Sequence, residues 1–361
     1  MAQPGTRPRP DRGATVNWES ARFALPTIES DGDWLDARDL VDGAAPPLRT
    51  TVTVEHPRTI ISRNASPDVP FDRSINPYRG CEHGCIYCFA RPTHAYHDLS
   101  PGLDFESRLF AKLDAAVLLR AELARPGYVA KPMALGTNTD PYQPIERDWR
   151  ITRGVLEVLA ECDHPVTITT KSDRVVQDIN LLAAMAAKGL ATVCVSITSL
   201  DAKVAGTVEP RAPTPARRLA AVRRLSEAGV PVYVSIAPVI PAITDHEVEA
   251  ILAHAADAGA RHAFFIPVRL PHEVAPLFRA WLDEHFPDRA AKVMATIRGL
   301  RDGRDNDPGF FTRMKGSGPW AELLRTRFQI ACRRHGLNAE RIVLRSDLFR
   351  PPPGRQGELF G

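Results

Sequence analysis

The sequence predicts an α/β fold in which short parallel strands alternate with helices that cross back over the sheet. From about residue 150 the chain repeats one order: a β-branched run, a helical stretch and a glycine. Gly189, Gly229 and Gly259 each stand just past an expected helix, where a left-handed backbone closes the last turn without a Cβ penalty. The repetition indicates parallel strands with crossover helices, in either an open doubly wound sheet or a barrel.

Six strand and helix units account for the chain between residues 74 and 285. The expected strands are 74–76, 132–136, 166–170, 191–198, 232–237 and 262–267. The helices expected after them are 105–123, 148–161, 174–188, 214–228, 245–258 and 272–285. The fourth helix has a clear start, because Thr214 suits its N-cap and Pro215 suits its first helical position.

The two ends of the chain differ from this repeating part. Residues 1–50 are rich in proline, arginine, aspartate and glycine, so we expect a mostly disordered N-terminal extension. The α/β part is then expected to span 51–285, and a small C-terminal region 286–350. That last region contains an expected helix over 320–335 and a possible strand over 341–345.

The composition is that of an ordinary globular protein, with 44% hydrophobic and 25% charged residues in a chain of 361. No apolar run approaches the ~18 residues that a membrane span requires, and no secretory signal is visible, so we expect a cytoplasmic protein with no membrane partner. A reducing compartment also suits free thiols. The net charge of +3 does not by itself indicate a nucleic-acid partner.

A cluster of cysteines is the strongest functional signal in the chain. Cys81, Cys85 and Cys88 form a C-x3-C-x2-C motif, and three thiolates on one loop can hold three irons of a four-iron, four-sulfur cluster. The fourth iron would then be open to a small molecule. The other cysteines stand alone in the sequence, at positions 162, 194 and 332, so a ferredoxin site with four cysteine ligands is disfavoured.

A structural zinc site is the main alternative for these cysteines. His83, His94 and His97 lie within a few residues of the thiols and could complete a tetrahedron. Zinc sites commonly take two ligands from one turn and two from elsewhere, and this motif supplies one thiolate too many for that arrangement.

The cysteine spacing, with Tyr87 just before the third cysteine, resembles the signature of the radical S-adenosylmethionine (SAM) superfamily. The resemblance implies that SAM chelates the open iron and is cleaved to a 5'-deoxyadenosyl radical that abstracts hydrogen from a substrate. It also implies that the six units form a partial (β/α)6 TIM-type barrel, with the cysteine loop at the carboxyl face where barrel active sites collect. Tyr87 becomes a candidate catalytic residue.

Longer motifs narrow the resemblance to one branch of that superfamily. Residues 63–106, residues 136–146 and the triplet Thr170-Lys171-Ser172 are similar to the spore photoproduct lyase-like, or DNA repair photolyase-like, branch over roughly residues 60–350. This implies a nucleic-acid substrate, with repair of a DNA lesion as the leading hypothesis. It also implies an electron donor such as flavodoxin or ferredoxin. RNA, a peptide or a metabolite is the alternative substrate, and a zinc-stabilised nucleic-acid-binding module without catalysis is the alternative class.

The same resemblance nominates residues that contact SAM. Many radical SAM proteins receive the SAM amino group at a Gly-Gly-Glu motif, and this chain has Gly136 to Asp140 there, so the candidates are Thr137, Asn138 and Asp140. A loop that merely turns through Asn and Asp is the alternative.

Two cations and a hydroxyl complete the expected SAM site. Lys171 follows a strand, and Arg211 follows the next one, so either could pair with the SAM carboxylate. Ser196 lies on the same face of its strand as Cys194. A satisfied strand hydroxyl and a surface arginine are the alternatives for Ser196 and Arg211.

The hydrogen donor of the resembled enzyme is not present at the corresponding place. Spore photoproduct lyase returns hydrogen from a cysteine near its second strand, where this chain has Leu135 and Gly136. Cys194 could point into the barrel and serve instead, although a lone cysteine in a strand is more often a small buried hydrophobic residue.

The C-terminal part contains two features of a protein that works on DNA. The first is the run 313–320 with the helix that follows it, which carries Arg325, Arg327, Arg333 and Arg334; these could contact phosphates or form a solvated helix face. The second is the proline-rich tail 351–361. Its Gln356, Leu359 and Phe360 resemble a peptide that docks on the replication sliding clamp, with a frayed terminus as the alternative.

Overall fold

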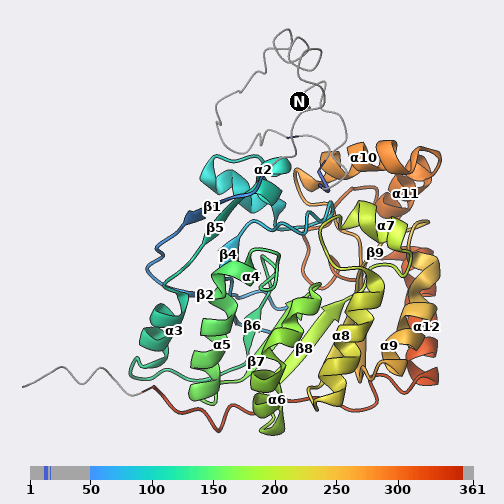
Figure 1. The fold of residues 1–361 in the computed structure, drawn as a ribbon. Helices are drawn as coiled ribbons and strands as arrows, with labels where there is room; N and C mark the ends of the chain where they lie inside the picture. The colour runs from blue at the N-terminus through green and yellow to red at the C-terminus, as the bar shows by residue number, and fades with distance from the viewer. Residues whose placement is uncertain (1–11, 15–16, 18–48, 353–361) are drawn as a thin grey trace, which may run out of the picture.

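A seven-stranded sheet forms the centre of the molecule in this computed structural model, which describes residues 12–14, 17 and 49–352 (Figure 1). The strand order is β10-β9-β8-β7-β6-β3-β2. The strands are β2 (Ile61–Arg63), β3 (Arg73–Ile75), β6 (Met133–Leu135), β7 (Val166–Thr170), β8 (Ala191–Ser196), β9 (Val232–Val239) and β10 (His262–Pro267). All neighbours pair in parallel except β2, which is antiparallel to β3.

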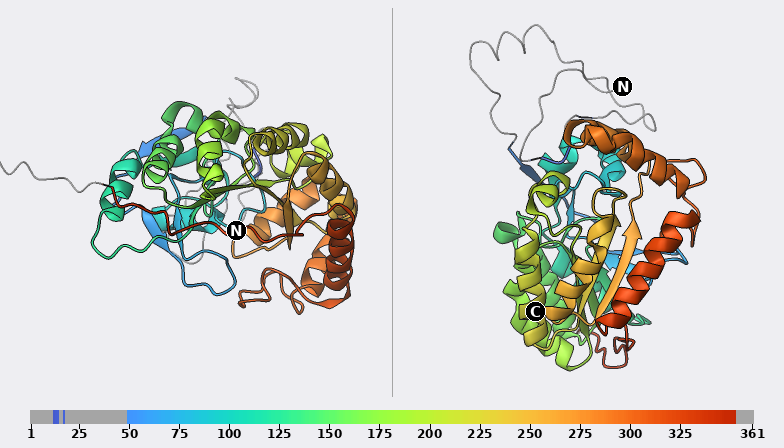
Figure 2. Two further views of the ribbon diagram at one scale, coloured as in Figure 1. Left: turned by 90° about the horizontal axis from the view of Figure 1, so that it is seen from below. Right: turned by 90° about the vertical axis from the view of Figure 1, so that its right-hand side faces the viewer.

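The main helices are α3 (Ala115–Leu123), α5 (Ile151–Glu161), α6 (Ile179–Ala187), α8 (Pro215–Glu227), α9 (Val248–Asp257), α10 (Val274–His285), α11 (Pro287–Gly299) and α12 (Gly318–Arg334). Most of them lie around the outside of the curved sheet, whereas α10 and α11 lie beyond the carboxyl ends of its strands (Figure 1 and Figure 2). Gly189, Gly229 and Gly259 have φ values of 73°, 79° and 92°, as expected for residues that end a helix. The predicted partial (β/α)6 barrel is confirmed, and β10 and β2 remain its two open edges.

The helix expected over 105–123 is wrong. The segment instead forms α2 (Leu103–Ser107), β5 (Arg108–Ala111) and α3. Strand β5 pairs with β1 (Thr51–Val54) and β4 (Tyr78–Arg79) in a second, three-stranded sheet. The helix prediction failed here because β1, which pairs with β5, lies more than fifty residues earlier in the chain. Local periodicity contains no information about such a distant partner.

Two further expectations need smaller corrections. The helix expected over 148–161 is broken at Arg150, whose φ is 48°, into α4 (Glu146–Trp149) and α5. The break allows the Glu146 carboxylate to accept hydrogen bonds from the N–H groups of Thr152 and Arg153 at the start of α5. The possible strand over 341–345 is absent from the described residues, and there Arg345 makes one backbone bond to Gly189.

The remaining short elements all precede or follow a strand. They are η1 (Arg91–His97), η2 (Asp173–Asp178), η3 (Asp245–Glu247) and α7 (Ala202–Val208). The helix expected over 174–188 therefore begins as the tighter turn η2, where the Ser172 side chain accepts a hydrogen bond from the Arg174 N–H. No described helix has both the length and the apolar character needed to cross a bilayer.

The C-terminal helix belongs to the same core as the barrel. Leu324, Phe328 and Cys332 of α12 are buried in the main hydrophobic cluster. The rings of Phe265 on β10 and Phe328 lie 4.8 Å apart, so α12 covers the outer face of the edge strand.

A short piece of the N-terminal extension is also buried. Arg12, Gly13 and Ala14 lie against α2 and the cysteine loop, and the N–H groups of Gly13 and Ala14 donate to the Glu106 carboxylate at 3.0 and 2.7 Å. These residues therefore differ from the expected disordered extension, because a buried carboxylate needs donors. The tail residues Gln356, Leu359 and Phe360 lie outside the described residues.

Candidate active site

The cysteine loop follows β4 at the carboxyl end of the barrel strands. Its turns are held by the backbone bonds from Gly84 N–H to Cys81 O (3.3 Å) and from Cys88 N–H to Cys85 O (3.2 Å). Cys81 N–H also donates to Phe105 O at 2.9 Å, which ties the loop to α2. These turns shape the short loop that carries Cys81, Cys85 and Cys88.

The protein alone does not stabilise the thiolates of Cys81 and Cys85. Burial raises the pKa of Cys85 to about 12, and burial with the nearby charges of Asp140, Cys85 and Cys88 raises the pKa of Cys81 further above its ordinary value. A metal centre would supply the missing positive charge.

The three thiols of the cysteine loop, Cys81, Cys85 and Cys88, are free and can serve as metal donors. In an iron–sulfur cluster each thiolate binds its own iron, so the donors of Cys81, Cys85 and Cys88 suit a cluster with one open iron.

Gln143 holds the cysteine loop in place and was not singled out from the sequence. Its amide oxygen accepts from Glu82 N–H at 2.9 Å, and its amide nitrogen donates to Gly80 O at 3.2 Å. Thr139 also donates to Gly80 O, at 2.7 Å. Both residues lie in the 136–146 motif, so that motif could have indicated their importance. It could not indicate that their partners are Gly80 and Glu82.

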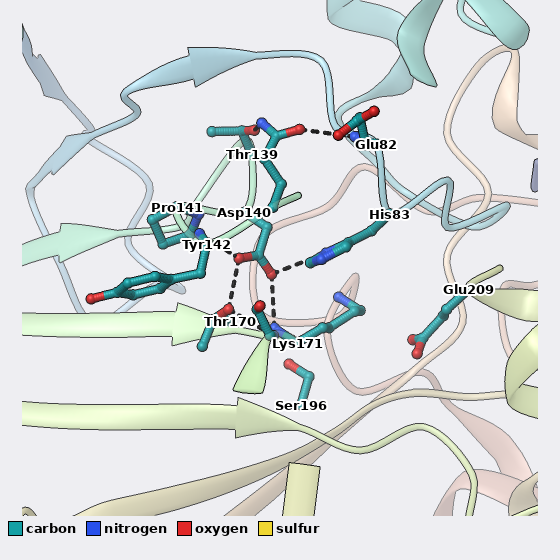
Figure 3. Close-up of polar contacts among 12 residues, drawn as sticks. Glu82, His83, Thr139, Asp140, Pro141, Tyr142, Thr170, Lys171, Ser196 and Glu209 are labelled. Atoms are coloured by element: carbon teal, nitrogen blue, oxygen red, sulfur yellow. Dashed lines mark hydrogen bonds and ion pairs between the residues drawn. The ribbon is translucent and has the colours of Figure 1, made fainter. Parts of the chain in front are cut away.

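Asp140 lies at the centre of a buried polar network (Figure 3). Its carboxylate accepts from Thr170 Oγ1 at 2.6 Å and from Lys171 N–H at 2.7 Å, and it lies 3.3 Å from His83 Nδ1. Burial alone would raise the pKa of Asp140, but His83 and these hydrogen bonds lower it to about 2. Asp140 therefore connects the ends of β6 and β7 to the cysteine loop.

Thr137 and Asn138, the other candidates of that loop, are partly exposed at the end of β6. Both contact Asn76, which follows β3: Asn138 N–H donates to Asn76 Oδ1 at 2.8 Å, and the Thr137 hydroxyl lies within 3.3 Å of the same amide. Among the described residues, the Asn138 side chain makes no hydrogen bond.

Lys171 extends from the end of β7 toward the cysteine loop, and its Nζ lies 5.8 Å from the centre of the Tyr87 ring. Burial alone would lower the pKa of Lys171, but the negative charges of Cys85, Glu209 and Asp140 raise it. In the described part of the structure, no acceptor lies within hydrogen-bond distance of this Nζ. The site thus contains a permanent cation that a ligand can use.

Glu209 is the main functional residue that sequence reasoning missed. Its carboxylate accepts hydrogen bonds from the hydroxyls of Tyr87 and Thr198, and it pairs with Arg218 of α8. Burial alone would raise the pKa of Glu209, but the charges of Arg218 and Lys171 hold it below its ordinary value. Tyr87 is thereby oriented by Glu209, and its own pKa is raised far above the usual range by burial.

Arg211 and Ser196 lie on the same side of the site. Arg211 donates to Glu82 of the cysteine loop at 3.0 Å and is about one-third exposed. Ser196 is buried at the end of β8, and its carbonyl oxygen accepts from Arg218 at 3.0 Å. Of the two, Arg211 is already engaged by a carboxylate of the protein.

Cys194 is buried on β8, where Thr169 of the neighbouring strand β7 is its register partner. Burial raises the pKa of Cys194 to about 12, although the charge of Lys171 acts in the opposite direction. The thiol is therefore protonated at neutral pH, which is the form that carries a hydrogen atom.

The basic residues of the C-terminal part are distributed over two places. Arg327 of α12 pairs with Glu249 of α9 at 2.7 Å, and Arg313 pairs with Asp68, which lies in the loop before β3. Arg325, Arg333 and Arg334 make no ion pair among the described residues.

The fold and the cysteine loop define a class: a partial barrel with a three-thiolate site at its carboxyl face. The sequence profile of the radical SAM superfamily matches residues 75–255, and the chain belongs to that superfamily. Its members are enzymes that use a four-iron, four-sulfur cluster and SAM, so the predicted family and cofactors are confirmed.

The chain is similar to uncharacterized proteins in sequence and to spore photoproduct lyase in fold. An uncharacterized protein of Mycobacterium tuberculosis is 37% identical over 232 residues, which cover 64% of this chain and 68% of that protein. An uncharacterized protein of Methanocaldococcus jannaschii is 25% identical over 218 residues, covering 59% and 76%. Spore photoproduct lyase complexed with dinucleoside spore photoproduct has a similar fold, with a TM-score of 0.56 and 17% identity over 80% of this chain and 81% of that chain.

Proposed function

We propose that this protein is a radical SAM enzyme that abstracts hydrogen from a nucleic-acid substrate, and that its reaction belongs to DNA lesion repair. The observation that carries the proposal is the position of Lys171 beside the loop of Cys81, Cys85 and Cys88 at the carboxyl face of the barrel, where its ammonium group has no hydrogen-bond acceptor among the described residues. The likeness in fold to a lyase crystallised with a dinucleoside photoproduct supports the substrate class.

The cluster and SAM supply the difficult chemistry, since an electron from the cluster cleaves SAM to a 5'-deoxyadenosyl radical. The protein binds and orients the reactants. Lys171 holds the carboxylate of SAM, because its ammonium group has no competing acceptor among the described residues. Thr137 and Asn138 offer oxygen acceptors to the SAM amino group, whereas Asp140 positions the strand ends on which they depend.

Other residues act around that centre. Ser196 offers a hydroxyl to the ribose at the end of β8, and Arg211 steadies the cysteine loop through Glu82. Tyr87, oriented by Glu209, covers the loop beside Lys171. Cys194 is the proposed hydrogen donor, because it is a protonated thiol next to Lys171 and because Leu135 and Gly136 offer no thiol on β6.

The alternative substrates, RNA, a peptide or a metabolite, share the same barrel. Nucleic acid is favoured by the basic residues of 313–320 and α12. The remaining proposals concern the setting: a cytoplasmic location, flavodoxin or ferredoxin as electron donor, and docking on the sliding clamp through Gln356, Leu359 and Phe360.

The decisive test is anaerobic reconstitution with iron and sulfide, followed by SAM and a strong reductant and by assay of 5'-deoxyadenosine. The wild-type protein should be brown and should form this product. Cys85→Ala should lower the yield by about 100-fold or more, because one iron loses its ligand. Cys162→Ala is the matched control, since Cys162 lies in the outer hydrophobic core, and it should retain the product.

Two outcomes would contradict the proposal. An unchanged yield with Cys85→Ala would remove the assignment of the cluster ligands. Colourless protein with one tightly held zinc would favour the zinc-stabilised binding module instead.

A further inference from the structure

A half-buried arginine without a carboxylate partner lies at the open edge of the barrel. Arg269 follows β10, and its Nη1 donates to the Met314 sulfur at 2.9 Å, a weak acceptor that does not neutralise the charge. No carboxylate lies within ion-pair distance of Arg269 among the described residues. Burial and the charges of Arg313 and Arg301 lower the pKa of Arg269 to about 10, which reflects this lack of compensation.

Residues 301–315 form the surroundings of Arg269 and connect the two edge strands of the sheet, β10 and β2. Arg301 donates to Arg313 O at 2.7 Å and to Val268 O at 3.2 Å, and so fixes this segment beside the end of β10. Arg313 pairs with Asp68, in the loop that joins β2 to β3. The charge of Asp307 acts on Arg301. Three arginines thus face two nearby carboxylates, and a net positive charge remains.

Exposed aromatic rings surround this charge. The Arg269 guanidinium lies 5.8 Å from the centre of the Phe89 ring, and Arg313 lies 4.9 Å from that of Phe310. Phe89, Phe310 and Phe311 are 53%, 51% and 58% exposed, which is unusual for such large apolar side chains. Phe89 directly follows Cys88, so this surface is continuous with the cluster-binding loop.

From these contacts we infer that Arg269, Phe89 and residues 310–315 form a binding site for a single-stranded segment of nucleic acid, with a phosphate on Arg269 and a base stacked on Phe89. A cation that lacks a counter-ion suits a phosphodiester, and exposed aromatic rings suit unpaired bases. An acidic peptide would match the charge, but it would leave the exposed rings without a flat partner. The inference rests on the proposed function and extends it to the residues that hold the substrate.

The test measures binding of a fluorescein-labelled single-stranded DNA of about 12 nucleotides. The full-length, cluster-loaded protein is used with SAM and without reductant, and anisotropy is followed at several salt concentrations. Arg269→Gln should weaken binding by about tenfold and lower the salt slope by about 1, since one phosphate contact is lost. Phe89→Leu should weaken binding by about fivefold, because a stacking surface is lost.

Two further variants control for charge and for folding. Arg120→Gln removes the same charge from the exposed Arg120–Glu161 pair on the outer helix α3 and should bind like wild type. Lys315→Gln changes an exposed residue next to Met314, so it should fold normally and still lower the salt slope. Iron content and thermal unfolding report whether each variant is intact.

Equal affinities for Arg269→Gln and Arg120→Gln, with a normal slope for Lys315→Gln, would overturn the site. Binding of polyglutamate but not of DNA by the wild type would also overturn it. Neither result would alter the 5'-deoxyadenosine yield of the wild-type protein, so the radical SAM chemistry is tested separately.

Discussion

Two arginines at the carboxyl end of the barrel differ in what neutralises them. Arg218, at the start of α8, is 1% exposed and pairs with the buried Glu209. Arg269, after β10, is half-buried and has no carboxylate partner in the described part of the chain. Removing a charge from water costs free energy unless an opposite charge compensates it. The protein itself neutralises Arg218, whereas we expect a bound ligand to neutralise Arg269.

A second buried pair encloses the cysteine loop on its other side. Arg91 and Glu106 are both fully buried, and Arg91 donates to the carbonyl oxygens of Cys85 and Gly84 at 2.9 and 3.1 Å. The loop that binds the cluster is thus fixed by the pairs Arg91–Glu106 and Arg218–Glu209. We infer that rigidity is concentrated at the cofactor, whereas the uncompensated charge lies where substrate binds.

The largest expected effect comes from breaking the buried Arg218–Glu209 pair. Glu209→Gln removes the negative charge and leaves the Arg218 charge buried without compensation, so the free energy of unfolding should fall by about 3–5 kcal/mol. Urea unfolding of the anaerobic protein measures it. Glu161→Gln, which breaks the exposed pair with Arg120, should lower the free energy of unfolding far less, because solvent screens that pair. Similar losses for both variants would show that the Glu209 pair is not special.

A smaller effect is expected at the cation beside the cluster loop. Lys171→Met should weaken SAM binding by about tenfold, because the SAM carboxylate loses a charge-assisted partner. Equilibrium dialysis of the cluster-loaded protein with labelled SAM measures the affinity. Lys188→Met, which removes a surface lysine paired with Asp163, is the matched control. Normal affinity in the Lys171 variant would assign the carboxylate to another group.

The smallest expected effect concerns a buried histidine, because a histidine can lose its charge on burial near neutral pH whereas an arginine keeps it. Burial lowers the pKa of His164 from 6.5 to about 4, so the folded protein keeps this ring neutral. Between pH 6.5 and 4 the unfolded chain binds the extra proton more strongly, so stability is full above pH 6.5 and falls as the pH decreases. His164→Gln should therefore reduce the loss of stability between pH 7.5 and 5.5 by about 1 kcal/mol.

Thermal unfolding of the wild-type and His164→Gln proteins at the two pH values provides the measurement. An identical loss in both would mean that other groups account for the acid sensitivity. The buried His94, whose pKa is also lowered to about 4 by burial, supplies an internal comparison within the cysteine-loop region.

Local sequence patterns predicted the regular half of the barrel well. The strands expected over 166–170 and 262–267 match β7 and β10, and the helix expected over 214–228 lies within a residue of α8 at each end. These elements follow from side-chain periodicity and from end signals such as Thr214-Pro215 and Gly229. Prediction failed over 105–123, where the strand β5 exists only because distant segments pair with it.

The candidate site shows the same division. The proposed cluster ligands Cys81, Cys85 and Cys88 were nominated by their spacing, because a cluster can take several of its donors from one short loop. Glu209 and Gln143 were not evident, since their roles depend on partners such as Tyr87, which lies 122 positions from Glu209. No local pattern contains that information.

By itself, the sequence determined the superfamily, the cofactors and the order of strands and helices, because each is written in residues that are close together along the chain. Only the tertiary structure decided which charges are neutralised. Glu209 compensates Arg218, and Glu106 compensates Arg91, but Arg269 remains without a counter-ion. The physical reason is that the free energy of a charge depends on its burial and on neighbours brought close by folding, and neither is a property of local sequence.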